Sequence, residues 1–244
     1  MKIIYKYSLV LIVLVNSMTS FVNAQQTDVK KIMNKVADIY EDKQQYHIAI
    51  TYDMHRGLKG NNITESYEGE MIKNGAYSNF QALNSEVIQF PKEQLIIEHD
   101  TKNITYIKMK GHTLAGSASP IDMTGFLTHY DKTKVVEKNG KFICELVSTK
   151  QNIQIPYSKV VLYINKENYH IEKQELFFAT LVPFVDQKTN ERKSDYGRLV
   201  ITLDYQELVE QSAPKLKDYF SFSSTKRVIS VSYTHLTLPT NREV

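Results

Sequence analysis

The first regular pattern in the chain is a single apolar stripe with helical spacing. Apolar residues fall at positions i, i+3, i+4, i+7 and i+11, namely Val29, Ile32, Met33, Val36 and Tyr40. This spacing puts one side of an α-helix against a core and leaves the other side in water. Thr27 or Asp28 can cap the first turn. The pattern therefore predicts an amphipathic helix over residues 29–40.

After this helix the pattern changes to alternation, with a period of two residues. Apolar and polar residues alternate over 46–54, which is typical of a half-buried strand. Turn residues such as Asn74-Gly75 and Asn139-Gly140 separate similar runs later in the chain. Further strands are predicted over 67–73, 86–90, 94–99, 104–109, 134–137, 141–147, 157–164, 169–181 and 197–208. Sequential strands with tight turns predict an antiparallel meander in a mainly β (α+β) fold.

One segment interrupts the strands. Residues 111–118 are small and flexible, and Ser119-Pro120 has the chemistry of a helix start, so a short helix is predicted over 119–129. Its apolar side is formed by Ile121, Met123, Phe126 and Leu127. Such a helix can act as a lid over an apolar surface or can plug one end of the sheet. The sequence leaves both interpretations open.

The N-terminal residues have the three parts of a secretory signal peptide. Lys2 and Lys6 precede an apolar run over 8–15, and Val22-Asn23-Ala24 offers a small-residue cleavage site. The run is shorter than the roughly 20 residues that a membrane-spanning helix needs. With no cysteine near Ala24 to carry a lipid, we expect cleavage after Ala24 and release into the periplasm.

The C-terminal residues differ from the rest of the chain. Residues 231–240 resemble the conceptual translation of a sequencing adapter, so 231–244 are interpreted as a non-native tail. With 1–24 as the signal peptide, the predicted domain covers 25–230. A single domain suits this length.

Composition and charge exclude some classes of function. The chain has 30 Lys and Arg against 27 Asp and Glu, without a clustered basic face, so nucleic-acid binding is not expected. Cys144 is the single cysteine and lies in an alternating run, which favours a buried core residue over a reactive thiol.

No set of residues in the sequence forms a recognisable catalytic or metal-binding motif. The Asp53/His55 and His129/Asp131 pairs can each supply two metal ligands, but a zinc site needs a third or fourth at suitable spacing. There is no G-x-S-x-G motif and no glycine-rich loop ending in Lys-Ser/Thr. We therefore predict no catalytic residues, no metal site, no cofactor and no enzymatic activity.

Several stretches, taken in order, resemble the LolA-like family of periplasmic lipoprotein carriers. The resemblance is carried by the helix at 29–40, the strand and turn at 67–75, the hairpin at 157–173 and the Phe-x-Phe stretch within 218–222. It covers most of 25–230. The resemblance implies an unclosed β half-barrel with a helical lid, and acyl chains of lipid or lipoprotein bound on an apolar concave face.

The resemblance also suggests where a ligand would lie and which partners to expect. With one side-chain parity on the concave face, the lining would comprise Ile48, Ile50, Met71, Ile97, Tyr106, Phe142, Leu162 and Leu203. These residues can equally pack the opening helix. The expected partners are acyl chains and the transfer proteins of the inner and outer membranes, with the chain as a monomer. A periplasmic protein-interaction or envelope-sensor module on the same scaffold is the alternative function.

Overall fold

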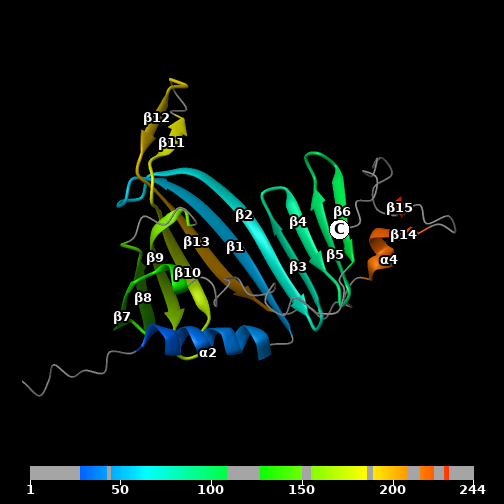
Figure 1. The fold of residues 1–244 in the computed structure, drawn as a ribbon, viewed down its shortest axis with the longest axis horizontal. Coiled ribbons are helices and arrows are strands. Elements are labelled where there is room, and N and C mark those ends of the chain that lie inside the picture. The colour runs from blue at the N-terminus through cyan, green and yellow to red at the C-terminus, as the bar shows by residue number, and fades with distance from the viewer. Residues whose placement is uncertain are drawn as a thin grey trace, which may run out of the picture.

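One antiparallel sheet of eleven strands forms the body of the chain (Figure 1). The computed structural model describes residues 28–42, 45–108, 127–149, 155–185, 189–207, 215–222 and 228–230. The strands are β1 (Gln45–Arg56), β2 (Ile63–Asn74), β3 (Tyr77–Ala82), β4 (Ser85–Gln89), β5 (Glu93–Glu98), β6 (Asn103–Lys108), β7 (Lys132–Lys138), β8 (Lys141–Val147), β9 (Tyr157–Asn165), β10 (Ile171–Phe178) and β13 (Gly197–Gln206). Their order is β6-β5-β4-β3-β2-β1-β13-β10-β9-β8-β7. The edge strands β6 and β7 do not pair with each other, so the sheet is unclosed, and the predicted mainly β antiparallel fold is confirmed.

Helix α2 (Val29–Asp42) packs its apolar stripe onto one face of this sheet. Asp28 caps the helix, because its Oδ1 accepts a hydrogen bond from the backbone N–H of Lys30 at 2.9 Å. The stripe residues are buried, with Val36 at 0% and Met33 at 1% exposure. The predicted N-terminal amphipathic helix is therefore confirmed.

The strand register assigns every residue to a face of the sheet, because directly paired residues point to the same side. We call the side that α2 covers the helix face, and the other side the opposite face. The buried helix-face residues share one cluster with the α2 stripe: Tyr46, Ile48, Ile50, Met71, Phe142, Cys144, Leu146, Val160, Leu162, Ile164, Ile171, Leu176 and Leu203. This cluster is the main core of the described chain.

A pair of tyrosine hydroxyls fixes the C-terminal part of α2 to the sheet. The pairing of β9 with β10 shifts register between Ile171 and Lys173, so a β-bulge follows the Ile171–Ile164 pair. The Tyr40 hydroxyl accepts the N–H of Ile171 at 3.3 Å, and the Tyr205 hydroxyl donates to its carbonyl, also at 3.3 Å. The two hydroxyls also contact each other. Helix, bulge and β13 are thus joined by directional bonds as well as by apolar packing.

A second, smaller core lies on the opposite face near the β6 edge. It contains Tyr77, Ile88, Phe90, Leu95, Ile97 and Ile104. Helix α4 (Leu216–Tyr219) packs here, and the Tyr219 ring lies 5.9 Å from that of Phe90 between centroids (Figure 1). The sheet is therefore covered on different faces by helices from the two ends of the chain.

Two further hairpins complete the described chain. β11 (Val182–Val185) pairs with β12 (Arg192–Asp195), and Figure 1 shows this hairpin extending from the end of the sheet that is opposite α2. β14 (Phe220–Phe222) pairs with β15 (Val228–Ser230).

The predicted lid falls largely outside the described residues. Ile121, Met123 and Phe126 belong to the undescribed range 109–126. The described part is a 3-10 turn, Leu127–His129, whose Leu127 packs against the main core. The lid helix therefore stays a prediction.

We expect Tyr40→Phe to destabilise the protein by about 1–3 kcal/mol, because the buried N–H of Ile171 loses its acceptor. Tyr163→Phe is a matched control, since its hydroxyl bonds to the carboxylate of Glu175 in a less buried position. Urea unfolding of both variants measures the difference. Equal stability of the two variants would contradict the proposed role of the Tyr40 hydroxyl.

Candidate functional site

Burial decreases along one cross-strand row of the helix face. Ile48 pairs with Met71, Met71 with Phe80, Phe80 with Val87 and Val87 with Ile96. Ile48 is 0% and Met71 6% exposed, whereas Phe80, Val87 and Ile96 are only half-buried. The position of α2 in Figure 1 explains this difference. The helix lies next to strands β7–β10 and away from strands β3–β6. The apolar row therefore continues beyond the helix that covers its first part.

A second group of apolar residues extends this uncovered region. Tyr52 pairs with Tyr67 on one side and Ile201 on the other, all on the helix face. Tyr67 is 44% and Ile107, on β6, is 38% exposed. We call the combined region the open apolar surface, defined by Tyr52, Tyr67, Phe80, Val87, Ile96, Ile107 and Ile201.

The open apolar surface has no ionised group at its centre. Burial raises the pKa of the Tyr52 phenol above its ordinary value, so this hydroxyl stays neutral. The nearest helix-face carboxylates along β2 and β5, Glu65 and Glu98, are exposed near the strand ends. The surface thus suits an uncharged apolar ligand better than a polar one.

Gly69 gives Tyr52 room to lie over β2. A Cβ atom at this position would stand 2.7 Å from the carbonyl oxygen of Gln81 and 3.0 Å from Cε2 of Tyr52. Both distances are shorter than ordinary contacts, so any side chain here would displace β3 or the tyrosine ring. The shape of the open apolar surface depends on this glycine.

The structure divides the residues predicted to line a ligand site. It brings together Ile48, Ile50, Met71, Phe142, Leu162 and Leu203, all buried in the main core with the α2 stripe. Ile97 and Tyr106 lie on the opposite face, in or against the second core. Whether any of them contacts a ligand stays a prediction.

The sequence interpretation missed the half-buried residues Phe80, Val87 and Ile96. The signal that could have found them is the length of the turns. β2 and β3 are joined by a two-residue turn, as are β3 and β4, so counting from Met71 across each turn leads to Phe80 and then to Val87. Without β3 in the prediction, this count was not possible.

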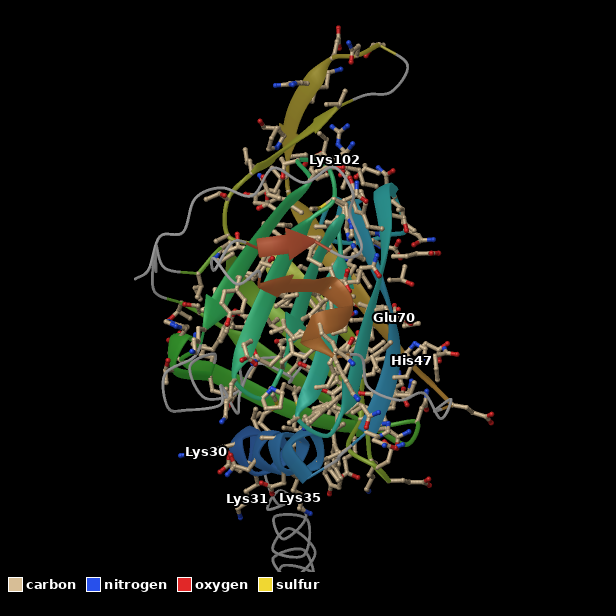
Figure 2. The ribbon with its side chains drawn as sticks, turned by 90° about the vertical axis from the view of Figure 1, so that its right-hand side faces the viewer. Lys30, Lys31, Lys35, His47, Glu70 and Lys102 are labelled. Atoms are coloured by element: carbon tan, nitrogen blue, oxygen red, sulfur yellow. The ribbon has the colours of Figure 1, made fainter. Side chains whose placement is uncertain are left out.

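The histidines contact partners on several strands. His47 Nε2 lies 2.5 Å from a carboxylate oxygen of Glu70 on the opposite face (Figure 2), while His55 is buried, and its pKa is lowered by burial and by Arg198. The described ranges contain no group of three or more His, Cys, Asp or Glu side chains that could hold a metal ion. The expectation of a protein without metal or catalytic residues stays a prediction.

Cys144 is a core residue, as the alternation predicted. It is 0% exposed, between Val135 on β7 and Leu162 on β9. Burial raises the pKa of its thiol to about 12.

In the described ranges, α2 and the other helices are too short or too polar to cross a bilayer.

Comparison with known proteins finds distant structural neighbours. No family model matches the chain, and no curated protein sequence matches it. Its structural neighbours include a LolA superfamily protein, a lipoprotein-sorting protein domain and the mycobacterial proteins LppX and LprF. A LolA superfamily protein from Nitrosomonas europaea is 13% identical, with 76% of this chain and 97% of that chain covered and a TM-score of 0.31. A lipoprotein-sorting domain from Vibrio parahaemolyticus is 9% identical, covering 78% and 94%, with a TM-score of 0.33.

A third neighbour is the lipoprotein LppX of Mycobacterium tuberculosis. It is 8% identical, with 75% of this chain and 99% of that chain covered and a TM-score of 0.35. Such low identities and TM-scores mark a distant similarity, and what these neighbours bind does not transfer to this chain.

We expect Gly69→Ala to destabilise the protein by about 1–3 kcal/mol, since the added methyl group meets backbone rather than a flexible side chain. Gly75→Ala is an informative comparison, because its added Cβ meets no atom within 4 Å and the strain there comes from a φ of +61° alone. Thermal unfolding of both variants measures the effect. A Gly69→Ala variant as stable as the unmodified protein would contradict the close packing.

At pH 8 we expect Cys144 to resist maleimide, because a thiol with a pKa of about 12 is protonated there and is also shielded by the core. In denaturing urea the same thiol should react within minutes. Mass spectrometry counts the adducts, and rapid labelling of the folded protein would show that the core opens around β8.

Proposed function

We propose that this chain is an exported periplasmic carrier that holds acyl chains of lipid or lipoprotein on the open apolar surface, without chemistry of its own. The observation that carries the proposal is the row from Ile48 to Ile96, where a buried core continues as half-buried apolar side chains beyond the cover of α2. A contiguous apolar surface of this kind in a water-soluble domain marks a place where something binds.

The chemistry of the surface selects the class of ligand. Its side chains are aliphatic or aromatic, and the Tyr52 phenol is neutral, so a hydrocarbon chain over Tyr52, Phe80, Val87 and Ile96 desolvates no charge. The Tyr67 hydroxyl, which donates to the exposed Glu65 carboxylate at 2.8 Å, is the polar edge of the surface. Each buried CH₂ of such a chain contributes about 0.8 kcal/mol, so several of them give useful and still reversible binding. Reversibility is what a carrier requires, since it must also release its cargo.

The remaining parts of the proposal come from the sequence. Residues 1–24 would direct export, the segment around Ile121 and Phe126 would cover the bound chain as a lid, and the carrier would work as a monomer. Transfer proteins at the inner and outer membranes would load and unload it. If the lid and loops instead fill the surface permanently, the alternative of a protein-interaction or sensor module applies.

Uptake of a fluorescent fatty acid tests the proposal, with Ile96→Asn as the diagnostic variant. We expect roughly fivefold to tenfold weaker binding, because about 1 kcal/mol of apolar contact is lost. Ile72→Asn is the matched control: it changes the same residue type, also half-buried, on the opposite face of the sheet. Thermal unfolding verifies that both variants fold.

Native mass spectrometry of gently purified protein tests whether the protein carries a bound lipid. A consistently empty protein that also takes up no fatty acid would overturn the carrier proposal. Equal losses in Ile96→Asn and Ile72→Asn would place the binding elsewhere than the open apolar surface.

A further inference from the structure

The end of the sheet opposite α2 presents exposed apolar side chains. Leu58 is 44%, Leu181 53%, Val185 47% and Tyr196 52% exposed. Leu58 lies in the turn between β1 and β2, and the others lie on or beside the β11–β12 hairpin, which extends from the sheet in Figure 1. We call these residues the hairpin-end surface. They do not belong to the open apolar surface, and they are not part of the main core or the second core.

Hydrogen bonds and an ion pair hold the turn and the hairpin together. The backbone N–H of Gly57 donates to the carbonyl of Tyr196 at 2.6 Å. The guanidinium of Arg198, which is 8% exposed, donates to the carbonyls of Gly57 and Gly60. Arg56 Nε lies 2.8 Å from Oδ2 of Asp195. Two segments far apart in sequence are therefore fixed as one unit.

Phe184 anchors the hairpin itself. It is 5% exposed, and a Cβ atom at Gly197 would stand 3.0 Å from its Cζ atom, so its ring packs against the start of β13. The Arg56 guanidinium lies over this ring at 5.9 Å from the centroid. Because Phe184 provides the packing, its neighbour Val185 is left to point outward. The fold holds the exposed side chains in place without burying them.

The segments that carry these apolar side chains have a net positive charge. In the described residues of 55–63 and 181–198, cationic side chains outnumber carboxylates: Arg56, Lys59, Arg192, Lys193 and Arg198 against Glu191 and Asp195. Asp195 is paired with Arg56, and Glu191 lies 3.0 Å from Lys193. Lys59 and Arg192 are exposed. Apolar side chains with basic neighbours fit the boundary between anionic headgroups and acyl chains.

From this combination we propose that the hairpin-end surface docks the protein on a bilayer that contains anionic phospholipid. Leu181 and Val185 enter the boundary region, and Lys59 and Arg192 contact the headgroups. Docking of this kind is distinct from the carrying of acyl chains, because it needs neither cargo nor the open apolar surface.

The opposite end of the molecule offers a contrast. Figure 2 shows Lys30, Lys31 and Lys35 on α2, away from the hairpin. Lys35 donates a hydrogen bond to the Tyr169 hydroxyl at 3.0 Å, and the apolar stripe of α2 is buried in the core. Among the described residues of α2, lysines are exposed and no large aliphatic side chain is, which makes this helix a control surface.

Vesicle flotation tests the proposal, with vesicles of phosphatidylethanolamine and phosphatidylglycerol and with vesicles of phosphatidylcholine alone. We expect the purified protein to float with the anionic vesicles, and the double variant Leu181→Ser/Val185→Ser to bind about tenfold more weakly. Lys59→Glu/Arg192→Glu should also weaken binding and should reduce its dependence on salt.

Matched controls distinguish binding through the hairpin-end surface from nonspecific adsorption to the vesicles. Val136→Ser removes an exposed valine from the edge strand β7, and Lys30→Glu/Lys31→Glu reverses charge on α2; both should bind as the unmodified protein does. A polarity-sensitive dye on Val185→Cys should shift to the blue with anionic vesicles, while the same dye on Val136→Cys should not.

Three results would overturn the proposal. They are an absence of vesicle binding by the unmodified protein, normal binding by both hairpin-end double variants, and loss of binding in the α2 variant alone. Fatty-acid uptake measured on the hairpin-end variants keeps the proposed carriage separate, because uptake should stay unchanged when docking fails.

Discussion

The structure depends on the packing of one short helix against a sheet that is much wider than the helix is long. The 14 residues of α2 extend for about 21 Å. Eleven strands at about 4.8 Å spacing span roughly 50 Å when laid flat. A single helix therefore covers only part of one face, and the apolar row from Ile48 to Ile96 extends beyond the part that the helix covers. Both the main core and the open apolar surface follow from this difference in size.

The rest of the sheet is stabilised on its other side. Near the β6 edge, the second core lies on the opposite face and packs against Tyr219 of α4. Strands β3–β5 thus have their fully buried apolar residues, such as Ile88 and Leu95, turned away from the open apolar surface. The half-buried residues on the helix face, Val87 and Ile96, are therefore not needed to hold these strands in the sheet, and they are free to contact a ligand.

The helix and most strands could be predicted from the sequence, because their apolar spacing is regular over many residues. Strand β3 could not, since its large apolar residues, Tyr77 and Phe80, are three positions apart and point to opposite faces. With β3 missing, the side-chain parity could not be followed into β4–β6, and Ile97 was grouped with Ile48 although the two point to opposite sides. The β12 strand has no apolar residue at all, so the alternation of apolar and polar positions does not predict it.

The position of β13 between β1 and β10 has a consequence for how the protein reaches this structure. β1 pairs on one edge with β2, which follows it directly in the sequence. Its other edge pairs with β13, whose last residue, Gln206, is paired with His47. The strands β7–β10 likewise join the rest of the sheet only through β13. Contacts between residues so far apart in sequence form slowly and late. A chain synthesised from its N-terminus would stay in two unjoined halves until β13, its last long strand, was complete, so the sheet edges at β1 and β10 would be open to other strands until then.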